Sequence, residues 1–220
     1  MRVFRNIVEG SSSTYEWIDL GLPSGLLWAS TNVGAEKPED FGLYFAWGET
    51  QGYSGITSEK GFYWGDYKYS SGQTSSTSTL FKGLTKYNTK SSSGTVDNLT
   101  TLEQVDDAAY TSDKTCRMPT RAEFEELTAN TTSVWETLNG VNGRRFTSKT
   151  NGNSIFVPAA GICNSGSVSN IGSDAILWSS SLSESNSRDA WDLYFDSGNV
   201  NMSISNRYYG MTVRAVKSIN

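Results

Sequence analysis

The chain has 220 residues, of which 36% are hydrophobic and 12% aromatic, and it carries a net charge of −5. That charge argues against nucleic acid or an anionic membrane as the main partner, and no apolar run is long enough to insert into a membrane. Histidine is absent, which excludes Ser-His-Asp and Cys-His catalysis and removes the commonest zinc ligand.

The first half of the chain predicts strands followed by a long irregular insertion. Residues 1–14 are expected to form a flexible tail, and residues 15–220 a single domain. A strand-turn-strand pattern covers 16–30, with Pro and Gly in the turn, and the aromatic run 44–49 predicts a core strand. The loop-rich insertion around 52–93 is polar but carries scattered aromatic residues, so we expect it to pack onto the body of the domain.

Two short helices are predicted in the middle of the chain. Thr101 and Thr120 each begin a capping box, with Gln or Glu three residues later, which predicts helices over 105–110 and from 121 onward. Asp106 and Asp107 would point about 100° apart on a helix, so they favour the helix dipole and do not form a catalytic pair. A hairpin is predicted over 145–157, across Asn151-Gly152-Asn153.

The C-terminal stretch 176–216 has the clearest pattern, a period of two with one apolar face. Residues 191, 193 and 195 share that face with residues 200, 202 and 204 of the next strand, and Ser197-Gly198 predicts the hairpin turn. The alternate positions carry Asn, Ser, Asp and Tyr, which predicts a polar surface displayed to solvent. The last strand, 212–216, is expected to pair near the N-terminal strand.

Several side chains admit two interpretations. Cys116 and Cys163 could form one disulfide or remain two buried thiols. Arg207 and Tyr208 could belong to a ligand-binding hot spot or to a turn packed on the sheet. Asp189, Asp192 and Asp196 could surround a cation, but no metal site is predicted from them.

Five sequence motifs resemble a known group of proteins. They are WIDLGLPSGLLWASTNVGAEKPEDFGLYFAWGET, LTKYNTKSSSGTVDNLTTLEQVDDAA, CRMPTRAEFEEL, NGVNGRRFTSKTNGNSIFVPAAG and LWSSS with NRYYGMTVRAV. Together they resemble the paralogous-domain family of surface and phage-related proteins of anaerobic gut bacteria. The segment from Arg117 to Phe124 is also similar to a helix start in formylglycine-generating enzymes.

The resemblance implies an α+β, C-type-lectin-like fold, with a twisted antiparallel sheet, two short helices and long loop insertions. The ending Val213-Arg214-Ala215-Val216 is similar to the family's V-R-P-V ending, which implies that Arg214 is an anchor that bonds loop carbonyls. It also implies a location outside the cell, on a bacterial surface or a phage particle. In some such proteins the last segment is the variable region of a diversity-generating retroelement, and the C-terminal stretch here looks similar. The calcium-binding motifs of C-type lectins are missing, so neither a cofactor nor a metal is expected.

The predicted function is therefore a non-enzymatic adhesin or receptor-binding module for a protein or glycan on another cell or surface. Tyr supplies contact area, and Ser and Asn supply adaptable hydrogen bonds. The predicted ligand-binding residues are Asp174, Asn186, Arg188, Asp192, Tyr194, Asp196, Asn199, Asn201, Ser203, Ser205 and Tyr208. The alternative is a structural subunit of a surface fibre, phage tail or capsid. An oxidase is a distant third, because its paired reactive cysteines are missing.

Overall fold

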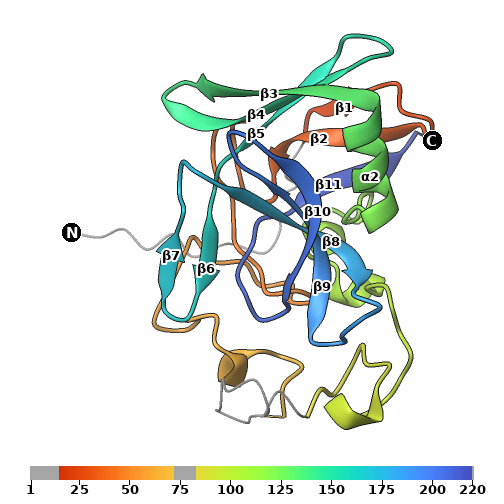
Figure 1. Cartoon of the computed structure of the whole chain (residues 1–220), viewed down its shortest axis with the longest axis vertical. Coiled ribbons are helices and arrows are strands. Elements are labelled where there is room, and N and C mark those ends of the chain that lie inside the picture. The colour runs from red at the N-terminus through yellow and green to blue at the C-terminus, as the bar shows by residue number, and fades with distance from the viewer. Residues whose placement is uncertain (1–14, 72–82, 220) are drawn as a thin grey trace.

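Strands dominate the computed structural model, which describes residues 15–71 and 83–219. Of the residues that the structure describes, 39% are in strands or bridges and 12% are helical, and the strands form four small antiparallel sheets (Figure 1). The α+β prediction, with one twisted sheet and two helices as its main parts, is therefore wrong. The helices that it relied on are five and ten residues long, and most of the rest is strand or loop.

The four sheets are built from strands that are mostly neighbours in the sequence. The first sheet has the order β1-β2-β11, the second β10-β9-β8, the third β3-β4-β5 and the fourth β6-β7. The strands are β1 Trp17–Asp19, β2 Leu26–Asn32, β3 Thr131–Leu138, β4 Val141–Ser148, β5 Ser154–Pro158, β6 Ile162–Asn164, β7 Ser167–Ser169, β8 Ala175–Leu182, β9 Asp189–Phe195, β10 Val200–Asn206 and β11 Arg214–Ser218.

The strand-turn-strand prediction at the N-terminus is confirmed by β1 and β2, and the last strand does pair with β2, placing Val216 opposite Trp28. The hairpin across Asn151-Gly152-Asn153 is confirmed as β4–β5. The run 44–49 is buried, but it makes only isolated bridges at Tyr44 and Phe45, so the core strand predicted there is wrong. Phe45 pairs only with Met211, and this single bridge does not extend into a ladder that would make the run a strand.

Helix α2 (Arg121–Asn130) begins at the predicted capping box, in which the Thr120 hydroxyl accepts the Glu123 N–H. Helix α1 (Ala108–Ser112) begins later than predicted, because the Asp107 carboxylate caps it and accepts the N–H groups of the next turn. A 3-10 turn, Gln104–Asp106, stands where the predicted helix would begin. Two more 3-10 turns, Trp64–Asp66 and Ser91–Ser93, lie in the insertion.

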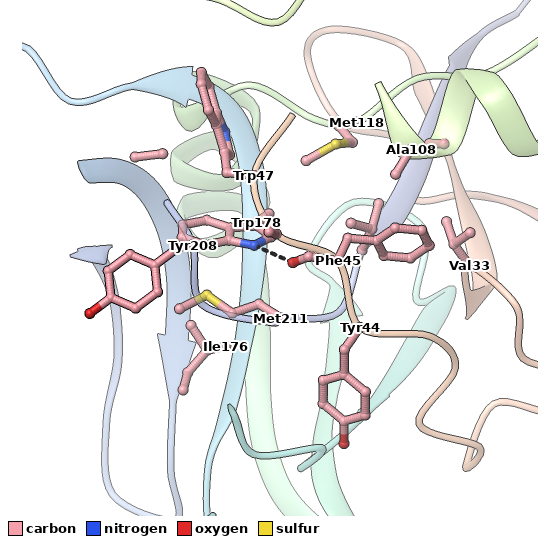
Figure 2. Packing of buried hydrophobic residues seen from close by; sticks show 14 of the residues in the cluster. Val33, Tyr44, Phe45, Trp47, Ala108, Met118, Ile176, Trp178, Tyr208 and Met211 are labelled. Atoms are coloured by element: carbon pink, nitrogen blue, oxygen red, sulfur yellow. Dashed lines mark hydrogen bonds between the residues drawn. The ribbon is translucent and has the colours of Figure 1, made fainter. Parts of the chain in front are cut away.

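The sheet β8-β9-β10 separates two hydrophobic cores. Leu193 and Phe195 of β9 face the core under α2, which contains Phe124. The opposite face of the sheet meets an aromatic core, where the Trp178 indole donates to the Phe45 carbonyl at 2.9 Å (Figure 2). This second face is the one that the sequence pattern assigned to solvent, so the exposure of the polar side is only partial. The apolar side is buried as predicted at Leu193 and Phe195, but Ile204, which was assigned to it, is exposed.

The insertion packs onto the aromatic core, as predicted from its aromatic residues. Phe62, Trp64, Tyr67, Tyr69 and Tyr87 are all buried there. Phe81, another of those aromatics, lies outside the described residues.

Arg207 directly follows β10 and binds the insertion to it. The Arg207 side chain is completely buried. Its guanidinium donates to the Tyr67 hydroxyl and to the carbonyls of Lys86, Tyr87 and Ser187. Of the two interpretations of Arg207, the packed turn is therefore correct and the ligand hot spot is wrong.

The other ambiguous side chains are also structural. Arg214 is buried and donates to the backbone carbonyls of Ala29 and Phe156, as predicted, and burial lowers its pKa to about 9. Cys116 and Cys163 are separate buried thiols, and burial raises the pKa of each to about 12.

Candidate functional site

Two of the predicted ligand-binding residues lie inside the protein and cannot form a contact surface. Asp192 is 0% exposed and Tyr208 is 6% exposed. Asp192 lies opposite Trp178 of β8, on the face of the sheet that meets the aromatic core. Tyr208 and Met211 come back over this face after β10, beside Trp178 and Ile176 (Figure 2). The prediction failed here because the chain that follows the hairpin packs over this face of the sheet and buries it.

Five other predicted residues lie in two separate groups. Asn186 and Arg188 are in the loop between β8 and β9, where the Asn186 side chain donates to Asp189 and accepts from Arg188. Asn201, Ser203 and Ser205 follow the edge strand β10; Asn201 is exposed and the two serines are half-buried. None of these five side chains lines the cleft at the turn end of the hairpin.

The remaining four predicted residues come together at the turn end of the hairpin. Asp174, Asp196 and Asn199 line an open cleft of about 520 Å³, which we call the hairpin cleft. The Tyr194 hydroxyl donates to the Asp196 carboxylate at 3.0 Å, directly beside it. The full lining is Trp135, Asn142, Gly172, Ser173, Asp174, Asp196, Ser197, Gly198 and Asn199. Residues more than sixty positions apart in the sequence thus border one space.

Sequence reasoning missed Trp135 and Asn142, through which β3 and β4 contribute to the lining. Trp135 is a half-buried residue of β3, and Asn142 of β4 donates from its side chain to the Gly172 carbonyl at 3.1 Å. The signal for β3 was present in the sequence: a run of β-branched residues over 131–137 precedes the Asn139-Gly140 turn. Asn139 and Gly140 adopt φ of 48° and 87°, as a tight hairpin turn requires.

Hydrogen bonds fix the shape of the turn at the cleft. One Asp196 carboxylate oxygen accepts the N–H groups of Gly198 and Asn199 at 2.6 and 2.7 Å. The Asn199 side chain and these N–H groups lower the pKa of Asp196 to about 2. Burial and the hydrogen bond to Asp196 raise the pKa of Tyr194 to about 12, so the hydroxyl keeps its proton at neutral pH.

Arg144 of β4 connects the turn to the third sheet by hydrogen bonds. Its guanidinium donates to the Asp196 carbonyl at 2.7 Å and to the Ser133 hydroxyl at 3.0 Å. Because Ser133 and Trp135 belong to the same strand, this arginine fixes the position of the turn relative to the indole. Direct hydrogen bonds therefore join the turn to the strands that carry Trp135 and Asn142.

The hairpin cleft offers hydrogen-bonding groups beside one aromatic ring. Its polar lining consists of carboxylates, amides and two serine hydroxyls next to one indole, which together accept and donate hydrogen bonds. Within residues 15–71 and 83–219 no three Asp, Glu or Cys side chains are grouped so that they could hold a metal ion. Asp174 and Asp196 alone would be a sparse ligand set for calcium.

Comparisons of the chain with protein-family models, curated proteins and solved structures found no match. The resemblance described from the sequence motifs therefore stays a prediction. In the part of the chain that the structure describes, no helix is long and apolar enough to cross a membrane.

Proposed function

We propose that this chain is a non-enzymatic ligand-binding module that acts outside the cell, on a bacterial surface or a phage particle, and that it contacts its ligand at the hairpin cleft. The observation that carries the proposal is the convergence of Asp174, Asp196 and Asn199 with Trp135 around one space. Ligand sites are typically concave, with aromatic side chains and a few fixed polar groups.

A neutral glycan fits this lining best. A sugar ring presents an apolar C–H face and a rim of hydroxyl groups that both donate and accept hydrogen bonds. The Trp135 indole offers an apolar surface, while the carboxylates of Asp174 and Asp196 accept and the amide of Asn142 does both. Two carboxylates at the rim disfavour an acidic ligand, because like charges repel.

The thiol chemistry of the chain supports a binding role. Both cysteines are buried and their raised pKa values keep them protonated at neutral pH, whereas a nucleophilic cysteine needs an accessible thiolate. The hydroxyl of Tyr194 is likewise held in its protonated form.

A steric block of the cleft tests the proposal. Ser173 is exposed and lines the cleft, so Ser173→Trp should fill the space without disturbing the cores. Ala122→Trp adds the same ring at an exposed position of α2 and is the matched control. On an array of neutral oligosaccharides, the wild-type chain and the control should bind the same glycans, and Ser173→Trp should lose them with little change in Tm.

Two results would reject the glycan assignment. One is glycan binding that survives in Ser173→Trp, and the other is the lack of any bound glycan on the array. A closed oligomer in size-exclusion chromatography that Ser173→Trp dissociates would instead favour the structural subunit of a fibre or phage particle.

We extend the proposal to diversification by a retroelement, and the structure limits where it could act. Substitutions at exposed positions such as Asn199 and Asn201 would leave both cores intact, whereas those at Asp192 and Tyr208 would alter buried packing. Resequencing the locus from many clones of one population should show adenine-site substitutions at the exposed positions. Substitutions spread evenly over the whole chain would contradict the idea.

A further inference from the structure

A second cleft, of about 390 Å³, lies between α1, the segment 114–118 and the end of β11. It shares no lining residue with the hairpin cleft. We call it the lysine cleft, because Lys114 and Lys217 both line it. Lys114 follows α1, and Lys217 belongs to β11.

The charge in this cleft differs in sign from that of the whole chain, whose net charge is −5. Three cations line it, namely Lys114, Arg117 and Lys217, against one carboxylate, Asp107. Arg117 is already neutralised by a bidentate pair with Glu123 at 2.5 and 2.8 Å.

The two lysines are the cations left to receive a ligand. Among the described residues, no carboxylate lies within ion-pair distance of either ammonium group. Lys114 instead lies over the Tyr110 ring at 4.5 Å, and Lys217 over the Trp17 ring at 4.6 Å. These ring contacts orient the ammonium groups but leave their positive charge uncompensated.

The one carboxylate in the lining is placed so that it does not repel an anion bound at the surface of the cleft. Asp107 is 4% exposed, and its oxygens accept the backbone N–H groups of Ala109, Tyr110 and Met118. Its charge is thus directed into the backbone of the α1 cap.

Hydroxyl groups complete the lining. Thr101 and Ser218, which are both exposed, belong to the lining together with the two lysines. Hydroxyls of this kind both donate and accept hydrogen bonds, so they suit a ligand that carries hydroxyl groups of its own. A purely inorganic anion would leave most of the 390 Å³ unfilled.

Cys116 also lines the cleft but does not add a reaction to it. Its thiol donates to the carbonyls of Ala109 and Asp113 at 3.4 and 3.3 Å. Burial, with Asp113 and Asp107 nearby, raises the pKa of this thiol to about 12. The cleft is therefore a binding site without a thiolate nucleophile.

We propose that the lysine cleft binds a monosaccharide-sized oxyanion, whose charged group pairs with Lys114 and Lys217 and whose hydroxyls meet Thr101 and Ser218. A compact lysine ammonium pairs with phosphate or carboxylate as a point charge, so both sugar phosphates and sugar acids carry the required chemistry. This site is additional to the hairpin cleft and does not depend on the function proposed there.

Calorimetric titration of the full chain with three probes tests the proposal: glucose 6-phosphate, glucuronate and neutral glucose. Saturable binding is expected for at least one of the two anions and not for glucose, and it should weaken as salt is added. Binding of the phosphate alone would assign a doubly charged group, and binding of the glucuronate a carboxylate.

A pair of double variants separates the cleft from net charge. Lys114→Gln with Lys217→Gln should weaken anion binding about tenfold, since each lysine contributes one partly exposed ion pair. Lys37→Gln with Lys149→Gln removes the same charge at exposed positions outside the cleft and should leave the affinity unchanged. Ser173→Trp should also bind the anion normally. The proposal is overturned if neither anion binds saturably, or if both double variants lose affinity equally.

Discussion

Asp192→Asn should stabilise the protein at neutral pH and remove part of its pH dependence. The Asp192 carboxylate is 0% exposed, and neither oxygen receives a well-formed hydrogen bond among the described residues. Burial raises its pKa from 3.8 to about 7, and the Ser205 hydroxyl offsets this effect only in part. An uncharged Asn of the same shape avoids the cost of burying the charge.

The direction of this pH dependence follows from how tightly the folded and unfolded chains bind the proton. Because the folded chain holds the Asp192 proton more tightly than the unfolded chain, stability is highest below the unfolded pKa and is lost as pH rises through about 7. A shift of about three pKa units, at about 1.4 kcal/mol each, corresponds to as much as about 4 kcal/mol above pH 7.

Urea denaturation of both proteins at about pH 5 and about pH 8.5 measures this effect. The stability advantage of Asp192→Asn should grow by about 3 kcal/mol between the two pH values. Asn201→Ala, an exposed change in the neighbouring strand, should show no such growth and is the control. A wild-type-to-Asn difference that is equal at both pH values would refute the reasoning, because it would mean that folding leaves the pKa of Asp192 unchanged.

Three further predictions concern buried groups. Arg207→Met removes the donor to three buried carbonyls, while the Tyr67 hydroxyl keeps its bond to the Trp47 carbonyl, so it should lower the unfolding free energy in urea by about 3 kcal/mol or more; a loss below about 1 kcal/mol would show that other contacts hold the insertion. A Cβ on Gly210 would lie 2.6 Å from the Phe62 ring and 2.8 Å from the Cys163 Cβ, so Gly210→Ala should cost about 1–3 kcal/mol in thermal unfolding, and an unchanged Tm would contradict this packing. Cys116 and Cys163 should stay unmodified by a thiol reagent until urea unfolds the chain, whereas rapid labelling of the native protein would disprove their burial.

Local patterns in the sequence were sufficient for several elements. The period of two predicted the β9–β10 pairing, in which Leu193 lies opposite Met202 and Phe195 opposite Val200. The Thr120 capping box predicted the start of α2 correctly, since a cap depends only on side chains within one helical turn. Thr101 has the same pattern but makes an isolated bridge with Ser181, because Asp107 provides the stronger cap.

Contacts between distant segments were beyond these patterns. Trp135 reaches the hairpin cleft because β3 pairs with β4, and β4 carries the Arg144 that bonds the turn. A sequence window around the hairpin contains none of these residues. The strand signal at 131–138 could have predicted β3, but not which residues it would face across the cleft.

The position of the hairpin cleft follows from how the middle sheet is covered. An antiparallel sheet that buries one face leaves the other for binding, but β8 and β9 meet a core on each side. Asp192, near the middle of β9, is therefore enclosed, and polar residues of the hairpin reach solvent only at its turn and along the edge strand β10. At the turn, Asp196 satisfies the backbone locally and Arg144 fixes it to the third sheet. Exposed polar groups and a rigid support thus coincide at the turn end of the hairpin, and this coincidence is the physical reason to place ligand binding there.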